Sequence, residues 1–362
     1  MNYGFFITSH GFGHASRACA IIDKLAAGNS NNFFLFTETP KWFFEISLQT
    51  PFTYFALKTD VGLVQTDPFN EDLDQTLVEL EKYYPFESNL ISLVTKLLVE
   101  NKIEIVVCDI SALGIYIADK LQIPSVLIEN FTWDWIYQFY SKTKPQLKRY
   151  ISYLEENYQK ATIRITSEPF CLEKKQAYQV SPIFREPRHA KHKVLKDLNF
   201  RDNDNIVLIS MGGIPIEKFN QKTISSIKNI KFLVPVNYLS QIQNDGPIIY
   251  LPHNHQFYHP DLVNISKLLI GKVGYSTIAE VYSLRKPFMY IGRENFPESK
   301  ILENYINSNI VSKPTKLEKF FSDGWYEDIE NLMQTIVEPR AIVNGADQVI
   351  RIIEENYGLQ FQ

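Results

Sequence analysis

The sequence has few cysteines, no surplus of basic residues and no long apolar run. Its three cysteines, Cys19, Cys108 and Cys171, are widely separated and include no Cys-x-x-Cys pair, so neither a disulfide framework nor a cysteine zinc site is expected. The formal net charge of −4 is not the cationic surplus with which nucleic-acid binders neutralise phosphates. We therefore expect a reducing compartment and no nucleic-acid partner.

The N-terminus and the hydropathy pattern also lack membrane signals. The first residues, MNYGFFITSHG, run straight into a strand-like segment, without a basic region followed by a long apolar run. No other apolar stretch reaches the roughly 18 residues needed to span a bilayer. The simplest expectation is a soluble, cytoplasmic protein.

What the sequence does contain is a regular alternation of strand-like and helix-like segments. A chain of 362 residues exceeds what one core supports, so two domains of about 150–200 residues are expected. Short apolar runs alternate with longer helical patterns, which is typical of an α/β fold with parallel sheets buried on both faces. The predicted strands are residues 3–8, 33–37, 52–57, 103–109, 124–129 and 162–166 in the first half, and 205–213, 231–235, 247–252, 267–274 and 287–292 in the second.

Residues 181–204 separate the two series of strands. This segment is polar, contains two prolines and lacks clear periodicity, which is typical of a linker. We therefore predict an N-terminal domain over residues 1–180 and a C-terminal domain over 205–340. A final helix within 341–362 is expected to pack back on the N-terminal domain.

Both halves contain one similar unit. Residues 103–129 and 266–292 each show the pattern strand, small-residue turn, helix, proline, strand, so two Rossmann-like domains facing a central cleft are expected. Ligand sites in such sheets lie at the carboxyl ends of the strands. The turns that follow strands are therefore where candidate site residues are sought.

The stretch ITSHGFGHASR, residues 7–17, forms such a turn after the first predicted strand. Gly11 and Gly13 precede a helix, so their backbone N–H groups and the helix N-terminus can contact an acceptor or a phosphate. The string has only two glycines of the dinucleotide fingerprint G-x-G-x-x-G, although Glu38 at the end of the second strand is placed to bind a ribose. A tight turn without a ligand is the alternative.

The same turn carries a candidate catalytic base. His14 and Arg17 lie three residues apart in the first helical turn and point to one side. Asp109 ends a neighbouring strand and can orient the imidazole of His14, as a general base requires. His10 is the rival base, and Arg17 is a further candidate for contact with an acceptor or phosphate. The alternative for either histidine is a structural role.

Two groups of histidines are candidate metal ligands, but neither pattern favours a metal site. His10 and His14 are four residues apart, but the glycines between them prevent a shared helix face. His253, His255 and His259 form a second cluster, followed by Asp261. A loop beside a ligand is the preferred interpretation of that cluster.

The second half contains two loops suited to a diphosphate. Gly212 and Gly213 follow one buried strand, and Gly274, Tyr275, Ser276 and Thr277 open a helix after another. Free N–H groups at such a helix start attract anions. Glu280, one turn further on, can accept both hydroxyls of a ribose, although a solvated helix carboxylate is the alternative.

The segment 130–158 mixes aromatic and basic residues, among them Trp133, Lys144 and Arg149. Trp133 can line an acceptor pocket, and the basic residues allow peripheral contact with a membrane surface. The preferred interpretation is that most of the aromatic side chains are core and the charges are solvated.

Taken together, HGFGHASR, residues 108–137, GGIP and residues 271–298 resemble the glycosyltransferase-like domain in the N-terminal half of plant-type L-arabinokinases. The matches occur in order over most of the chain. More distantly, the sequence is similar to nucleotide-sugar glycosyltransferases of the two-Rossmann-domain (GT-B) class. The kinase half of an arabinokinase has no counterpart in this sequence, so no kinase activity is expected.

The resemblance implies a UDP-sugar donor bound mainly by the C-terminal domain, an acceptor bound mainly by the N-terminal domain, and no required metal or cofactor. It implies that Glu280 holds the donor ribose and that Ser276 and Thr277 contact the diphosphate. His14 matches the histidine after the first strand, and Asp109 the aspartate that orients it in some members. The sequence has Lys272, Val273 and Gly274 where the glucuronosyl-type enzymes have an HxGxxS signature.

The leading hypothesis is an inverting, metal-independent transfer of a sugar to a hydroxyl acceptor, which can be a small molecule, a glycan or a lipid. His14, or else His10, removes the acceptor proton, and Arg17 and Arg293 strengthen the positive field around the leaving diphosphate. A non-catalytic nucleotide-sugar binder or regulatory protein is the alternative. An NAD-dependent enzyme and a sugar epimerase are less favoured.

Overall fold

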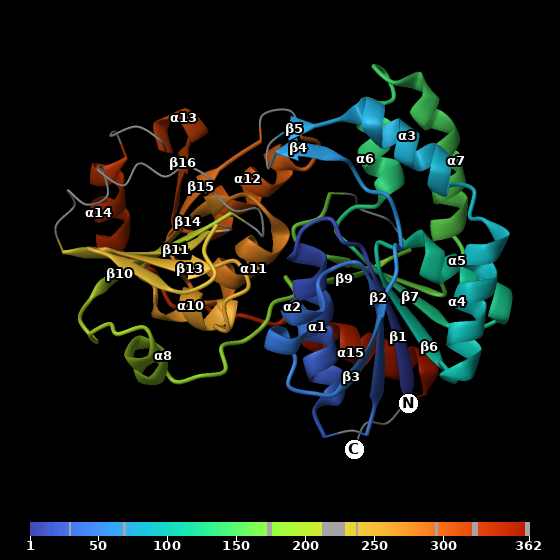
Figure 1. The fold of residues 1–362 in the computed structure, drawn as a ribbon, viewed down its shortest axis with the longest axis horizontal. Helices are drawn as coiled ribbons and strands as arrows, with labels where there is room; N and C mark the ends of the chain where they lie inside the picture. The colour runs from blue at the N-terminus through green and yellow to red at the C-terminus, as the bar shows by residue number, and fades with distance from the viewer. Residues whose placement is uncertain are drawn as a thin grey trace. The chain divides into compact units, whose positions relative to one another are not determined.

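The computed structural model of the chain divides into two compact units. Unit 1 comprises Met1–Ile183 and Val343–Gln362, and unit 2 comprises Phe184–Ile342. Each unit is α/β, with a mainly parallel sheet and its own helices (Figure 1). The structure describes residues 1–28, 30–67, 70–171, 176–211, 229–236, 238–293, 296–320 and 325–358.

The described residues of unit 1 form a seven-stranded parallel sheet. The chain moves outward from β1 in one direction and from β6 in the other, so the switch point of the sheet lies between these two strands. The strands, in the order in which they pair, are β3 (Phe52–Ala56), β2 (Asn32–Thr37), β1 (Asn2–Ile7), β6 (Ile105–Asp109), β7 (Ser125–Glu129), β8 (Ile163–Ser167) and β9 (Tyr178–Val180).

Helices cover both faces of this sheet, with α1, α2 and α15 on one face and α4, α5 and α7 on the other (Figure 1). The apolar stripe of α1 recurs every three or four residues, at Ala15, Ala18, Ile22 and Leu25, and all four side chains are buried. The elements outside the main sheet are α1 (Gly13–Ala26), α2 (Lys41–Ser47), the hairpin of β4 (Gln65–Asp67) and β5 (Asn70–Glu71), α3 (Leu73–Tyr83), α4 (Ser88–Glu100), α5 (Ala112–Leu121), α6 (Trp133–Tyr140), η1 (Pro145–Leu147), α7 (Lys148–Tyr158) and α15 (Gly345–Tyr357).

Unit 2 also has seven strands in its described sheet, and all pairs are parallel except the edge strand β12. Its switch point lies between β10 and β14. The strands, in pairing order, are β12 (Gln243–Asp245), β13 (Ile248–Pro252), β11 (Ile230–Val236), β10 (Asn205–Ser210), β14 (Leu268–Lys272), β15 (Phe288–Ile291) and β16 (Ser312–Thr315). The described helices are α8 (Lys191–Asp197), α10 (His259–Ile265), α11 (Tyr275–Ser283), α12 (Ser299–Asn309), α13 (Leu317–Phe320) and α14 (Tyr326–Gln334).

The α/β fold predicted from the sequence is confirmed. Every predicted strand is present, with ends that differ by at most three residues. The strands that the sequence pattern missed are β4, β5, β9, β12 and β16, which are short and largely exposed, so they lack the continuous apolar run that marked the others.

The segment predicted as a linker contains helix α8. Val194 and Leu195 of this helix are buried in the core of unit 2, and the division into units assigns Phe184–Ile342, which includes α8, to that unit. Two buried apolar residues give too short a periodic pattern for the helix to be recognised in the sequence.

The C-terminal helix α15 belongs to unit 1. Ala346, Val349 and Ile353 are buried in the same core cluster as residues of α1, and Lys24 of α1 forms an ion pair with Asp347 at 3.1 Å. Within the described residues, no helix combines the length and the apolarity needed to cross a membrane.

Candidate functional site

The turn between β1 and α1 lies at the switch point of the unit 1 sheet. Gly11 has a φ of 75°, a left-handed conformation that costs glycine little, and Gly13 is the first residue of α1. Asp109 is the last residue of β6, the neighbour of β1. The sheet thus brings together His14 and Asp109, which are 95 residues apart in the sequence.

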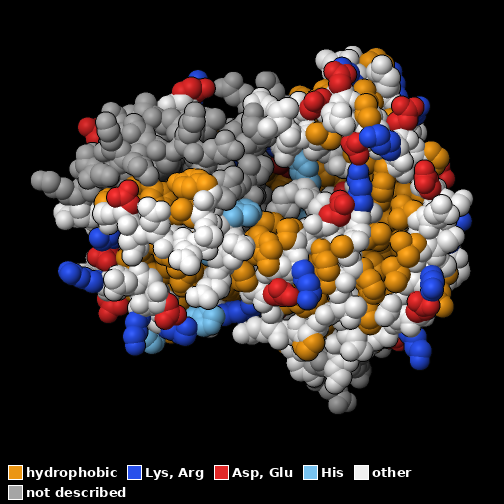
Figure 2. All heavy atoms as spheres, viewed as in Figure 1, with side chains coloured by type: hydrophobic (Ala, Val, Ile, Leu, Met, Phe, Trp, Pro, Cys, Tyr) orange, Lys and Arg blue, Asp and Glu red, His pale blue; other side chains and the backbone are white. Residues whose placement is uncertain are grey.

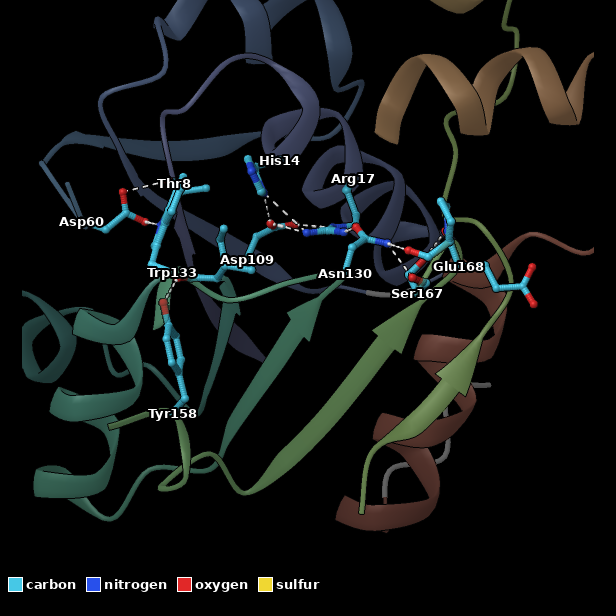
Figure 3. A network of polar contacts seen from close by, with 12 residues as sticks. Thr8, His14, Arg17, Asp60, Asp109, Asn130, Trp133, Tyr158, Ser167 and Glu168 are labelled. Carbon is cyan, nitrogen blue, oxygen red and sulfur yellow. Dashed lines mark hydrogen bonds and ion pairs between the residues drawn. The ribbon is translucent and has the colours of Figure 1, made fainter. Parts of the chain in front are cut away.

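The imidazole of His14 and the carboxylate of Asp109 are in direct contact. Their Nδ1 and Oδ1 atoms lie 2.6 Å apart, and both residues are buried. An ionised carboxylate only accepts hydrogen bonds, so Nδ1 is the donor and a neutral imidazole has its lone pair on Nε2. No hydrogen bond to Nε2 is found among the described residues. In Figure 3, the ring of His14 extends away from Asp109.

Arg17 holds the other side of the same carboxylate. Its Nε and Nη2 atoms donate to Asp109 at 2.7 and 2.6 Å, the forked geometry that guanidinium favours. Nη1 donates to Asn130, whose amide donates in turn to the carbonyl of Ser167. The network therefore ties the carboxyl ends of β6, β7 and β8 to α1 (Figure 3). The sequence analysis predicts that Arg17 contacts an acceptor or a phosphate. Such a ligand would have to displace one of these partners.

Burial and charge set the ionisation of this pair. Burial disfavours the carboxylate of Asp109, but the charge and hydrogen bonds of Arg17 and the contact with His14 outweigh it, so the pKa of Asp109 lies below its usual value. Burial lowers the pKa of His14 below 6.5, and the charge of Arg17 lowers it further, against the opposing effect of Asp109. His14 is therefore neutral at pH 7, as a general base must be.

His10 and Trp133 lie at the same end of the sheet. Their rings meet edge to face, with centroids 5.2 Å apart. Trp133 is fully buried, and its Nε1 donates to Asp60 at 3.2 Å. Thr8 Oγ1 donates to the other oxygen of that carboxylate at 2.7 Å. Asp60 was not predicted from the sequence, although its position just after β3 was a signal.

In unit 2, the loop that follows β14 leads into α11 at the switch point. Gly274 is the N-cap of α11, and Tyr275, Ser276 and Thr277 form its first turn. The first N–H groups of a helix have no partner within it and attract anions. The diphosphate contact expected of these residues stays a prediction. Gly212 and Gly213, the other predicted contacts, lie outside the described residues.

Glu280 is buried in a polar chain rather than solvated. Its Oε1 accepts from Nη2 of Arg185 at 2.8 Å, and its Oε2 lies 2.6 Å from Nδ1 of His259. Nε2 of His259 is 3.0 Å from Oγ of Ser210, the last residue of β10. Burial opposes ionisation, but the charges of Arg185 and His259 and their hydrogen bonds bring the pKa of Glu280 to about 2.

The remaining predicted residues of unit 2 have these surroundings. The guanidinium of Arg293 lies 3.6 Å from the centroid of the Phe296 ring. Burial, together with His259 and His253, lowers the pKa of His255 to about 4. Asp261 accepts hydrogen bonds from His189 and from the backbone of Arg188. Within the described part of the chain, no three His, Cys, Asp or Glu side chains lie close enough to hold a metal ion.

Most of the aromatic side chains named in the segment of α6 and α7 lie in the core, as the preferred interpretation predicts. Trp133, Tyr137 and Tyr140 are buried, whereas Phe139 is exposed. Lys144 and Arg149 form ion pairs with Asp74 and Glu81. On the face shown in Figure 2, Lys and Arg side chains alternate with Asp and Glu. Peripheral membrane contact stays a prediction.

The structure thus brings five predicted side chains of unit 1 to one sheet edge: His10, His14, Arg17, Asp109 and Trp133. The sequence did not single out Asp60 or Asn130 in unit 1, nor Ser210 or Arg185 in unit 2. Asn130 and Ser210 directly follow or end strands, which was the available signal. Arg185 lies in the predicted linker, so nothing in the sequence pointed to its contact with Glu280.

The chain was compared with protein-family models, with curated proteins and with solved structures. No family model matches the chain. Its sequence is 26% identical over 366 residues to L-arabinokinase from Arabidopsis thaliana, covering 98% of this chain. The chain spans about a third of the length of that relative, 34%.

Solved structures of similar fold cover nearly the whole chain. The calicheamicin glycosyltransferase CalG4 has a TM-score of 0.62 at 11% identity, covering 99% of this chain and 98% of its own. A UDP-glucosyltransferase from Polygonum tinctorium has a TM-score of 0.59 at 12% identity, covering 98% and 92%.

A putative UDP-N-acetylglucosamine 2-epimerase from Listeria monocytogenes has a TM-score of 0.57 at 9% identity, covering 98% of this chain and 96% of its own. The fold is therefore not confined to proteins named as glycosyltransferases. The resemblance inferred from the sequence is confirmed: the chain is similar over nearly its whole length to part of L-arabinokinase, and its fold is that of the GT-B glycosyltransferases.

Proposed function

We propose that the protein transfers a sugar from a nucleotide diphosphate sugar, a UDP-sugar, to a hydroxyl acceptor with inversion and without a metal ion. The observation that carries this proposal is His14, whose Nδ1 is held by Asp109 while its Nε2 keeps a lone pair without a described partner. An imidazole oriented in this way is suited to remove a hydroxyl proton. The similarity to a UDP-glucosyltransferase supports the donor class.

In this mechanism, unit 1 supplies the base and unit 2 binds the donor. His14 Nε2 takes the acceptor proton, and Asp109 stabilises the imidazolium that forms, as its depressed pKa allows. The acceptor oxygen displaces the diphosphate from the anomeric carbon. The N–H groups of Tyr275, Ser276 and Thr277 would stabilise the leaving diphosphate electrostatically.

Glu280 is the candidate for the donor ribose. Its two oxygens already accept from Arg185 and His259, but a carboxylate has further lone pairs for hydroxyl donors. A pKa of about 2 keeps it ionised and acceptor-only at neutral pH. Arg293 is a proposed supplement to the positive field around the diphosphate.

The test is UDP release from a panel of UDP-sugars with hydroxyl acceptors, preceded by a thermal-shift screen that identifies the bound donor. We expect one donor to raise the unfolding temperature and to release UDP only when His14 is intact. Normal turnover in the H10A/H14A double variant would contradict the assignment of the base.

One observation favours a second function, a non-catalytic nucleotide-sugar binder. Arg17 shares the Asp109 carboxylate with His14 and lowers the pKa of His14, which weakens the imidazole as a base. This alternative predicts tight UDP-sugar binding in calorimetry with no transfer to any acceptor. Detectable transfer excludes it.

A further inference from the structure

The carboxyl group of Asp60 has no part in the proposed transfer, yet it is buried at the same end of the unit 1 sheet. Only 5% of the residue is exposed. Its Oδ1 accepts from Thr8 Oγ1 at 2.7 Å, and its Oδ2 accepts from Trp133 Nε1 at 3.2 Å. No described cation forms an ion pair with it.

These two contacts connect Asp60 to the surroundings of His10. Thr8 precedes His10 by two residues, and the Trp133 ring meets the His10 ring edge to face at 5.2 Å. Gly62, two residues after Asp60, lies against both rings. A Cβ atom there would stand 3.0 Å from the Trp133 ring and 3.2 Å from Nδ1 of His10. Asp60 therefore binds both Thr8, at the start of the turn, and Trp133, whose ring contacts His10 in that turn.

A carboxyl group in this position is stable without its charge. An unpaired buried charge is costly, and burial raises the pKa of Asp60 to about 7, against the opposing hydrogen bonds of Thr8 and Trp133. Both bonds persist in the neutral form, because a threonine hydroxyl can accept as well as donate, while the indole still donates to the carbonyl oxygen.

The other ionisable groups that act on Asp60 do not supply a positive charge to compensate it. The anionic groups are Asp109 at the end of β6 and Glu38 after β2, and both favour the neutral form. His10 is the histidine of the adjoining turn. The tyrosines whose pKa is raised in part by the charge of Asp60 are Tyr83, Tyr84, Tyr137 and Tyr158.

We propose that Asp60 is a positioning residue of the unit 1 site, and that its protonated carboxyl holds Thr8 and Trp133 in place around the turn that carries His10. Loss of the proton places an unpaired negative charge among these groups and weakens the arrangement. The inference rests on the proposed function only for its kinetic readout.

The first test does not depend on activity. In D60N, the amide oxygen accepts from Trp133 and the amide nitrogen donates to Thr8, so this variant imitates the protonated carboxyl at every pH. The folded protein keeps the Asp60 proton up to about pH 7, whereas an unfolded aspartate loses it near pH 4. The contribution of Asp60 to the stability of the wild type should therefore fall as pH rises from 4 to 7.

The expected result is that D60N lacks this fall, so that its urea midpoint exceeds that of the wild type by a margin that grows across the same pH range. The matched control is D134N, which changes another buried carboxyl of unit 1 and shows what the loss of a buried carboxyl does apart from the contacts of Asp60. Identical pH dependence in D60N and the wild type would overturn the proposal.

The second test uses the UDP-release assay. In the wild type, kcat should decline above pH 7 as Asp60 loses its proton. D60N should keep kcat within about threefold of the wild type at pH 6 and should not show this decline. D60L, which leaves Thr8 and Trp133 without their acceptor, should lower kcat about tenfold with the KM for the donor unchanged. Wild-type kcat in D60L overturns the positioning role. If the wild type itself releases no UDP, the proposed function fails while the urea result still decides the role of Asp60.

Discussion

The two units contain the same three kinds of side chain in the same order of contact. In each, a buried carboxylate accepts from an arginine guanidinium on one side and lies 2.6 Å from a histidine Nδ1 on the other. In both, the carboxylate pKa lies below its usual value because the arginine and histidine outweigh the effect of burial. The groups are Arg17, Asp109 and His14 in unit 1, and Arg185, Glu280 and His259 in unit 2.

The difference between them is the second nitrogen of the imidazole. His259 Nε2 is hydrogen-bonded to Ser210 Oγ at 3.0 Å, whereas the structure describes no hydrogen bond to His14 Nε2. An imidazole with both nitrogens engaged fixes its neighbours, and one with a lone pair remaining can accept a proton. The proposed function accordingly gives proton transfer to unit 1 and ligand binding to unit 2.

The largest effect expected from this comparison is on catalysis. H14A removes the lone pair and should lower kcat about a thousandfold, within the range for loss of a general base. H259A is the matched variant, and it should raise the KM for the donor while leaving kcat within about tenfold. Steady-state UDP release measures both. Equal losses of kcat in the two variants would contradict the division of roles.

The next effect is on stability and on the basicity of His14. R17A leaves Asp109 buried without its cation, so the free energy of unfolding should fall by about 3–5 kcal/mol. The positive charge of Arg17 lowers the pKa of His14, so the acid limb of the kcat/KM profile should move to higher pH. Urea unfolding and a pH–rate profile measure these changes.

The control for this prediction is R17K, which keeps the charge but not the fork. It should lose stability while the acid limb stays near its wild-type position. An unchanged acid limb in R17A would show that Arg17 does not set the ionisation of His14.

Acid unfolding tests the carboxylate of unit 2. The pKa of Glu280 is about 2 in the folded protein, against an ordinary value of 4.5. Its contribution of about 3 kcal/mol is present above pH 4.5 and is lost as the pH falls toward 2. E280Q should therefore be less stable than the wild type at pH 7 and should approach it in acid. A constant difference between pH 7 and pH 3, measured by urea unfolding, would contradict this ionisation.

The sequence predicts where the residues of these sites lie better than it predicts which side chains they contact. His14 and Asp109 were predicted because they lie in the turn after one strand and at the carboxyl end of its neighbour, places that the strand pattern locates. Glu280 lies within helix α11, and it was predicted from the family resemblance. Their pairing with arginine was not predicted for Asp109 or Glu280. Arg17 was expected to contact a ligand, and it contacts Asp109 from 92 residues away.

Partners of this kind depend on packing that periodicity does not encode. Arg185 lies in a polar segment that the composition assigns to a linker, yet it is buried beside Glu280, 95 residues further along the chain. Asp60 shows the same limit, because its burial depends on Trp133, 73 residues away. The sequence thus locates strand ends, and tertiary structure decides which charges meet there.

The smallest expected effect isolates the one contact that distinguishes the two histidines. S210A removes the hydroxyl beside His259 Nε2 and should lower the free energy of unfolding by about 1 kcal/mol, the ordinary net value of a hydrogen bond. The loss of an anchor should weaken donor binding a few-fold, measured by calorimetry, with kcat unchanged. A fall of kcat in S210A as large as that in H14A would instead place Ser210 in the proton transfer. The hydrogen bonds to both nitrogens of His259 would then no longer explain the difference between the His14 and His259 sites.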